Sequence, residues 1–374
     1  MLDSLPFLSP DPREMPAGEG ELFRRRTRAA TLLELAENVT SERRAEITRE
    51  ILVLGQSALP ALHRAAASRK ENSAALSRAL IRMLLPDEIG REIYMGLTRD
   101  KKNYRIENGA ILLSRLSYPN LPIHRVIRDL DELANRASEY VCAALSIPKK
   151  EAKRAANRDA AEVIKVLGSF WREEGFQGKA DNFYCDKNSY VSDVLERRTG
   201  LPIALSVVYL AVARRIYLNA DGVGLPGHFI VRVSITDKEG EHFALIDPFN
   251  GARSIDLNDC RQRVEALGQP FIPEEHLKAV SPREILARMC NNLLALFNHQ
   301  KKSFEAERVA TVLSHIQPRD PIPLLLRGER RLRRGDRKGA RADFEKAHTL
   351  DPEGPVGRTA SELLERMGYE NPFA

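Results

Sequence analysis

His228 and Asp247 are the residues whose types and spacing point most directly to chemistry. They open and close a segment in which "HFIVRVSI" and "EHFALID" flank the polar turn "TDKEGE", a pattern that predicts an antiparallel hairpin. If the hairpin is centred between Asp237 and Lys238, His228 and Asp247 are directly opposed, with Cβ atoms about 4.5–5.5 Å apart. A centre one residue further along makes them a diagonal pair on the same face. The carboxylate could then orient the imidazole as a general base; alternatively, the two residues only begin and end the strands.

The segment before this hairpin predicts a buried helix. "IALSVVYLAVA" is apolar on every face except at Ser206 and the Tyr209 hydroxyl, and Pro202 stands in its first turn, where a missing N–H costs little. Ser206 lies one turn beyond Pro202 and is a candidate nucleophile for His228. A displacement of about 6 Å is large beside the ~1 Å tolerance of productive geometry, which favours a hydroxyl that only bonds the carbonyl four residues earlier.

Further candidates lie on either side of this helix. Cys185 is a candidate thiol, although its neighbours do not favour a reactive thiolate. Asn188 and Ser189 could line the same cleft or belong to an ordinary surface helix. Gly227 ends "GVGLPG", which spells the dinucleotide-binding pattern, but this loop follows a helix and precedes a strand, the reverse of the order that such a site needs. The loop therefore predicts no nucleotide site.

The motifs "NSYVSDVLERRTGLPI", "GVGLPGHF" and "DPFNG" resemble the SirB-type branch of the transglutaminase-like superfamily. The resemblance covers about residues 100–260 and implies a papain-like α+β core. Active members of the wider superfamily use a Cys-His-Asp triad, in which the Cys opens the buried helix and forms a thioester. The resemblance assigns the His and Asp of that triad to His228 and Asp247.

The cysteine of the triad has no counterpart in this chain. In the superfamily the helix begins Gly-x-Cys, and the resemblance aligns Gly200 and Arg214 without a gap, which puts Pro202 at the cysteine position. Because proline has no nucleophile, thioester chemistry is excluded there. The resemblance thus favours a non-catalytic domain that binds a protein or peptide, without metal or cofactor. A hydrolase or acyltransferase whose nucleophile has moved to Ser206 or Cys185 is the alternative.

Helical patterns flank the central segment. "ILVLGQSALPALHRAAASRKENSAALSRALIRML" predicts helices that end near Gly55, enter at Pro60 and restart near Ser73, and its signature resembles a HEAT-type repeat. Near the other end, Pro318 and Pro352 are 34 residues apart, the period of tetratricopeptide repeats, and the same offset relates Ala306 to Ala340 and Ile316 to Leu350. Repeats of the tetratricopeptide type bind peptides, which agrees with a binding role.

A basic run lies within this second helical region. "RRLRRGDRKGAR" holds seven basic side chains in twelve residues, namely Arg330, Arg331, Arg333, Arg334, Arg337, Lys338 and Arg341. The run could meet an acidic partner, and a nucleic-acid-associated protein is a second alternative function, but a solvated helix face is the favoured interpretation. We therefore disfavour nucleic acid as the partner.

The chain as a whole has the composition of an ordinary soluble protein, with 374 residues, 43% hydrophobic and 29% charged. Without a signal peptide or an apolar span it is expected to be cytoplasmic, and its widely spaced cysteines predict neither disulfides nor a zinc site. The oligomeric state stays open. We expect a mainly helical α+β protein divided into a loose leader (1–20), HEAT-like helices (21–98), a transglutaminase-like domain (99–280, with a helical lead-in over 99–165 and the core over 166–280) and tetratricopeptide-like repeats (281–374).

Overall fold

The structure is a computed structural model that describes residues 19–100, 104–178, 185–237 and 240–369. The leader expected over residues 1–20 therefore lies almost entirely outside the described residues. The chain divides into two compact units, Met1–Glu88 and Ile89–Ala374.

The first unit is helical, as the sequence predicts. Its helices are α1 (Glu19–Leu35), α2 (Ser41–Leu54), the 3₁₀ turn η1 (Gly55–Ala58), α3 (Leu59–Ala66) and α4 (Glu71–Arg99), of which the residues through Glu88 belong to this unit. Gly55 ends α2 with φ of 59°, a conformation that glycine adopts without steric cost. The predicted helix end at Gly55 and entry at Pro60 are confirmed, and the third helix starts two residues earlier than expected, at Glu71.

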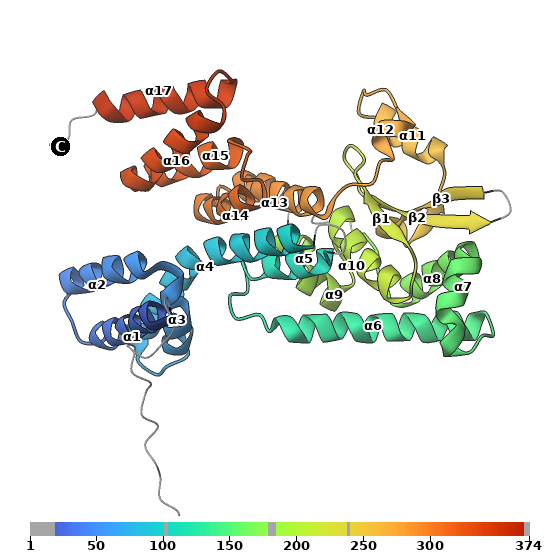
Figure 1. Ribbon diagram of the computed structural model, residues 1–374, viewed down its shortest axis with the longest axis horizontal. Helices are drawn as coiled ribbons and strands as arrows, with labels where there is room; N and C mark the ends of the chain where they lie inside the picture. Colours follow the sequence, from blue (N-terminus) through green and yellow to red (C-terminus); the bar gives the residue numbers. More distant parts are fainter. Residues whose placement is uncertain (1–18, 101–103, 179–184, 238–239, 370–374) are drawn as a thin grey trace, which may run out of the picture. The chain divides into compact units, whose positions relative to one another are not determined.

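Helices also open the second unit, and α5, α6 and α9 among them pack against α10 (Figure 1). They are α5 (Ile106–Ser114), α6 (Ile123–Ala144), η2 (Lys149–Glu151), α7 (Ala152–Arg158), α8 (Ala160–Glu173), η3 (Asp186–Asn188), α9 (Val191–Arg197) and α10 (Pro202–Arg215). Every residue from Ile203 to Ala213 is buried, which confirms the predicted central helix. Arg215 at its C-terminal end lies 2.8 Å from the buried carboxylate of Glu107 and 2.7 Å from Asp131, so ion pairs tie α10 to α5 and α6.

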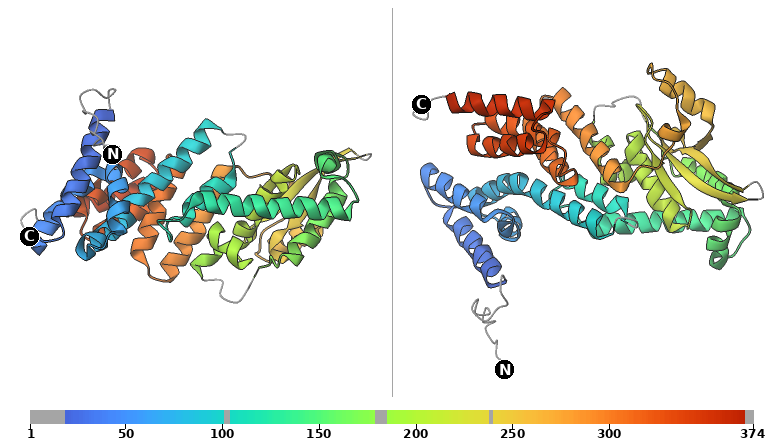
Figure 2. Two further views of the ribbon diagram at one scale, coloured as in Figure 1. Left: turned by 90° about the horizontal axis from the view of Figure 1, so that it is seen from below. Right: turned by 45° about the horizontal axis from the view of Figure 1, so that its top comes forward.

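The described strands form one antiparallel sheet in the order β1-β2-β3-β4. Its strands are β1 (Ala220–Val223), β2 (Ile230–Asp237), β3 (Gly240–Asp247) and β4 (Arg253–Ile255). The predicted hairpin is β2–β3, and β1 and β4 are short flanking strands that the sequence pattern did not reveal. Figures 1 and 2 show α8 and α10 on one side of the sheet and α11 (Leu257–Glu265) on the other. The fold is therefore α+β, as expected.

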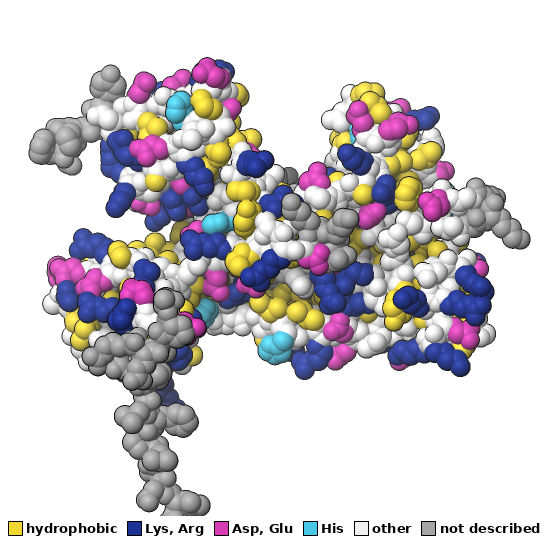
Figure 3. Space-filling model, viewed as in Figure 1, with side chains coloured by type: hydrophobic (Ala, Val, Ile, Leu, Met, Phe, Trp, Pro, Cys, Tyr) yellow, Lys and Arg dark blue, Asp and Glu magenta, His cyan; other side chains and the backbone are white. Residues whose placement is uncertain are grey.

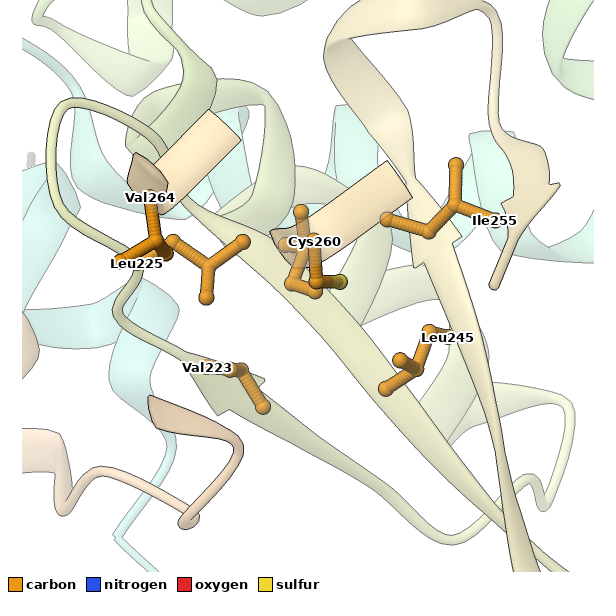
Figure 4. Close-up of a cluster of buried hydrophobic side chains, with 7 residues drawn as sticks. Val223, Leu225, Leu245, Ile255, Cys260 and Val264 are labelled. Atoms are coloured by element: carbon orange, nitrogen blue, oxygen red, sulfur yellow. The ribbon is translucent and has the colours of Figure 1, made fainter. Parts of the chain in front are cut away.

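The face of the sheet toward α11 carries a hydrophobic cluster (Figure 4). It combines Val223, Leu225, Ile230, Leu245 and Ile255 with Cys260 and Val264 of α11. This packing fixes α11 over the end of β3. A capping box between Asp256 and Asp259 begins α11 by satisfying backbone N–H groups in its first turn. The cluster thus positions the polar side chains of α11 beside the site described below.

Helices complete the second unit. They are α12 (Pro273–His276), α13 (Pro282–His299), α14 (Ser303–Ile316), α15 (Ile322–Arg333), α16 (Arg337–Leu350) and α17 (Pro355–Tyr369). From α13 onward each packs against the next in the chain. Ala306 and Ala340 are buried in α14 and α16, as the 34-residue offset requires, while the assignment to tetratricopeptide repeats stays a prediction. Among the described residues, none of the helices is long and apolar enough for a membrane crossing.

Candidate functional site

The structure brings His228 and Asp247 together. The Nε2 atom of His228, just before β2, lies 3.0 Å from Oδ1 of Asp247, the last residue of β3. The centre of the hairpin differs from the one taken first: Asp237 pairs with Gly240, so the turn is centred one residue later and the two residues form a diagonal pair rather than a directly opposed one. Diagonal neighbours on one face remain within reach of a side chain as long as histidine.

Asp247 is completely buried and its carboxylate is fully hydrogen-bonded. Besides His228, it accepts bonds from the backbone N–H of Asn250 (3.3 Å), the Asn250 side-chain amide (2.7 Å) and Arg263 of α11 (3.2 Å). Burial alone would raise the pKa of Asp247, but the bond and charge of His228, with Asn250 and Arg263, outweigh it and hold the pKa below its ordinary value. The carboxylate therefore stays ionised.

This ionised carboxylate sets the orientation of the His228 ring. Because a carboxylate can only accept, Nε2 donates, and Nδ1 is left as the ring atom able to take a proton. The edge of the ring also meets Phe249, with the ring centroids 5.7 Å apart and the planes at 89°. A histidine held in this way has the arrangement of a general base in acyl transfer.

Pro202 and Ser206 of α10 differ in their relation to this histidine. Pro202 occupies the first turn of α10 and lines the same cavity as His228. Ser206 is completely buried, and its hydroxyl donates a hydrogen bond of 3.4 Å to the backbone carbonyl of Phe229. The expectation that Ser206 bonds the carbonyl four residues earlier is therefore wrong, because its hydroxyl bonds the segment just before β2 instead. Within the described residues Ser206 makes no hydrogen bond to His228.

Of the other candidate residues, Ser189 and Gly227 line the cavity beside His228, whereas Cys185 and Asn188 do not. Cys185 is half-buried, just before η3, and makes no hydrogen bond to His228 in the described part of the chain. Asn188 is buried, and its side chain accepts a bond of 3.0 Å from Arg197. Ser189 lies on the cavity wall, only 4% exposed, and its hydroxyl has no hydrogen-bond partner among the described residues. Gly227 also lines the cavity, with φ of 67°.

Two of the remaining cysteines are core residues. Burial raises the pKa of the Cys260 thiol to about 11 and that of the Cys290 thiol to about 12. Neither is a thiolate at neutral pH, so neither supplies the missing nucleophile. No cluster of His, Cys, Asp and Glu side chains suited to a metal ion occurs among the described residues.

The cavity beside His228 has a volume of about 450 Å³. One wall consists of Ser189, Leu201, Pro202, Ile203, Gly227, His228 and Phe229, and the opposite wall is the α13 face formed by Arg288, Asn292, Ala295, Leu296 and His299. The α13 wall was not predicted from the sequence, because residues 281–374 were expected to form a separate repeat region. A signal was present: Arg288, Asn292, Ala295 and His299 recur at the three- and four-residue spacing that puts them on one helix face.

Arg288 is the cationic residue of this wall. Its Nη2 donates to the backbone carbonyls of Leu225 (2.7 Å) and His228 (2.8 Å), and its guanidinium lies 5.5 Å from the centre of the Phe229 ring. Burial lowers the pKa of Arg288, yet the side chain stays charged. Within the described residues no carboxylate pairs with it. Arg288 thus connects α13 to the loop that carries His228.

The glycines of "GVGLPG" are required by close packing and by the backbone conformation of this loop. A Cβ atom at Gly224 would lie 2.8 Å from Nη1 of Arg288, and one at Gly222 would lie 2.8 Å from the Phe229 ring. Gly227 adopts a left-handed conformation just before His228. The resemblance to a dinucleotide fingerprint therefore has its origin in close packing around Arg288 and Phe229.

The basic run of the C-terminal helices is partly neutralised by ion pairs. Arg331 lies 3.0 Å from Asp343, Arg334 lies 3.0 Å from Glu307, and Arg333 lies 3.4 Å from Glu329. Arg330 is buried and bonds the Asn298 side chain, and Arg337 donates to the carbonyl of Met367, whereas Lys338 and Arg341 are exposed. Figure 3 shows acidic side chains among the basic ones over these helices. Ion pairs within the helices thus involve Arg331, Arg333 and Arg334, while Arg330 and Arg337 also bond neutral groups.

Comparisons with known proteins place this site in a family. Residues 124–291 match the family model described as transglutaminase-like superfamily. A UPF0162 protein of Xylella fastidiosa (strain 9a5c) is 31% identical over 261 residues, which cover 68% of this chain and 87% of that protein. A UPF0162 protein of Pseudomonas aeruginosa is 31% identical over 177 residues, covering 47% and 58%. F-box only protein 21 of Homo sapiens is 28% identical over 163 residues, covering 40% and 24%. No solved structure matches the chain.

Proposed function

Because the chain belongs to the UPF0162 family and contains a transglutaminase-like domain, we propose that this domain is non-catalytic and binds a protein or peptide segment in the cavity beside His228. The flanking helices would extend the binding surface. The proposal assigns the chain to the SirB-type branch, with HEAT-like helices before the domain and tetratricopeptide-like repeats after it.

One observation carries the proposal: a base-like His228–Asp247 pair faces a cavity in which Pro202 stands at the nucleophile position. The pair has the geometry to accept a proton, but the residue that should give one has no acidic hydrogen. Ser206 is held by the Phe229 carbonyl, and Cys185 does not bond the ring. A cavity with an apolar lining and a few polar groups, but without a nucleophile beside the base, is suited to hold a ligand rather than to transform it.

The similarity to F-box only protein 21 supports a modular role. The matched segment spans only 24% of the human protein, so a domain of this kind occurs as one part of a larger chain. In this chain the domain is likewise joined to helices on both sides. A domain that occurs in different chain contexts is compatible with a binding role, which the site itself has to supply.

The experiment that tests the proposal combines labelling with binding. The full chain is treated with an electrophilic acyl probe and analysed by intact mass, and in parallel it is titrated with a library of short peptides. We expect saturable peptide binding that is lost when Ala295→Trp fills the cavity, and no stoichiometric acylation. Acylation that disappears in Cys185→Ala or in Ser206→Ala would instead establish a relocated nucleophile and overturn the proposal.

A further inference from the structure

The cavity holds a positive charge that lacks a negative partner. Arg288 lines it, and the described residues place no carboxylate beside the guanidinium. Two of its hydrogen bonds go to the Leu225 and His228 carbonyls through Nη2, so the other guanidinium nitrogens are not needed for that contact. An arginine that is half-buried without an acid is an electrostatic site for an anion.

Neutral hydrogen-bonding groups accompany this charge. The Ser189 hydroxyl is nine-tenths buried and has no partner in the described structure, and Ser189 lines the cavity. The Asn292 side chain, one helical turn beyond Arg288, lines it as well and makes no hydrogen bond within the described residues. A guanidinium, a hydroxyl and an amide together match the acceptor capacity of a single carboxylate.

Apart from Gly227, His228 and His299, the rest of the lining is apolar. Leu201, Pro202, Ile203, Phe229, Ala295 and Leu296 contribute it. A volume of about 450 Å³ accommodates a hydrophobic side chain with its backbone, but not a long peptide. The cavity therefore suits a ligand with one carboxylate and one compact apolar group.

Resting on the proposed function, we infer that this cavity recognises the free C-terminal carboxylate of a peptide whose last residue is apolar, with Arg288 as the anion-binding residue and Asn292 and Ser189 as supporting hydrogen-bonding groups. Capture of a chain end is a recurrent mode of peptide recognition. A small apolar carboxylic acid offers the same chemistry from another source, and the test separates the two.

The test compares three probes on the full chain by isothermal titration: N-acetyl-Ala-Ala-Leu with a free carboxylate, the same peptide as its C-terminal amide, and octanoate. We expect the acid to bind at least about tenfold more tightly than the amide, since loss of one charge-assisted pair costs about that factor. Arg288→Gln should remove this acid-to-amide ratio, and Asn292→Ala should reduce it. Asn291→Ala, the adjacent and exposed position of α13, is the matched control and should leave it unchanged.

The ratio distinguishes recognition from a folding effect, because a merely structural role of Arg288 would weaken acid and amide alike. Equal binding of acid and amide by the natural chain overturns the inference while leaving the proposed peptide-binding function intact. Octanoate binding that depends on Arg288, without binding of either peptide, supports the carboxylate site and overturns its assignment to peptides, together with the proposed function. Binding of no probe overturns both.

Discussion

Pro202→Cys would restore the side chain that the superfamily's chemistry requires, and the structure allows its effect to be worked out. Pro202 is in the first turn of α10, where its missing N–H leaves no intrahelical bond unmade, so a cysteine can replace it at a cost of about 1 kcal/mol or less. The new thiol would face the cavity that His228 lines. It would also lie at the positive end of the helix dipole.

The expected rate follows from these two influences. An ordinary thiol has a pKa of about 8.5, and a helix N-terminus with a histidine lowers it; a value near 6.5 is moderate for such sites. At pH 5.5 the thiolate fraction would rise about 90-fold, and the accompanying loss of intrinsic nucleophilicity would take back about 8-fold. Alkylation should thus be about tenfold faster than for an unassisted thiol at pH 5.5, but only about threefold faster at pH 7.

The assay is the rate at which iodoacetamide labels the introduced thiol of the Pro202→Cys variant between pH 5 and 9, read by mass spectrometry. Cys185→Ala in the background removes the half-buried thiol from the measurement. Adding His228→Ala should shift the pH profile toward that of an ordinary thiol, because only the contribution of the helix N-terminus is then left. A profile centred near pH 8.5 in the variant, or one that His228→Ala leaves unmoved, would refute the argument that the His228–Asp247 pair faces an unoccupied nucleophile position.

Three further predictions concern the residues around this pair. Asp247→Asn should lower the free energy of unfolding by about 1–3 kcal/mol, because it breaks charge-assisted bonds in a buried site. The pKa of Asp247 is depressed in the folded state, so its contribution to stability is present above the unfolded-state pKa near 3.9 and is lost as the pH falls through the folded-state pKa. Urea denaturation of the variant should therefore show a weaker loss of stability in acid than that of the natural chain. Ser206→Ala should cost about 1 kcal/mol or less and leave peptide binding unchanged in titrations, since the hydroxyl makes one long bond; a loss of binding would restore Ser206 as a site residue. Gly224→Ala should destabilise the domain by about 1–3 kcal/mol in denaturant titrations, because the new Cβ would lie 2.8 Å from Arg288, whereas Gly268→Ala, with open space around it, should be affected only through its backbone conformation.

Local patterns predicted the site's central elements from the sequence. The continuous apolar run marked α10 as buried, because a helix apolar on every face is an interior helix. The β-branched and aromatic residues on both sides of a polar turn marked β2 and β3. The hairpin register was less certain, since the polar segment "TDKEGE" allows the turn to be centred at neighbouring positions without exposing the apolar face. The pairing of His228 with Asp247 survives that uncertainty because both centres keep them on one face.

The hydrogen-bond partners of Asp247 other than His228 could not be predicted from local sequence patterns. Asn250 reaches back within a 3₁₀ turn, and Arg263 arrives from α11, a helix positioned by the hydrophobic cluster on the sheet. Neither contact has a period or a fixed spacing that marks it in advance. The same holds for the Ser206 hydroxyl, whose acceptor is on a neighbouring segment rather than in its own helix. Side-chain partners that come from tertiary packing require the packing itself.

The cavity bears on how the parts of the chain cooperate. The sequence predicts a boundary at residue 280, but one wall of the cavity comes from residues before it and the other from α13, after it. Arg288 bonds the carbonyl of His228 directly, and the match to the transglutaminase-like family extends to residue 291 and so includes Arg288. A ligand in the cavity would therefore contact the first helix of the C-terminal region together with the His228 loop. Since α13 packs against α14 and each later helix against the next, the wall that carries Arg288 is continuous with the C-terminal helices.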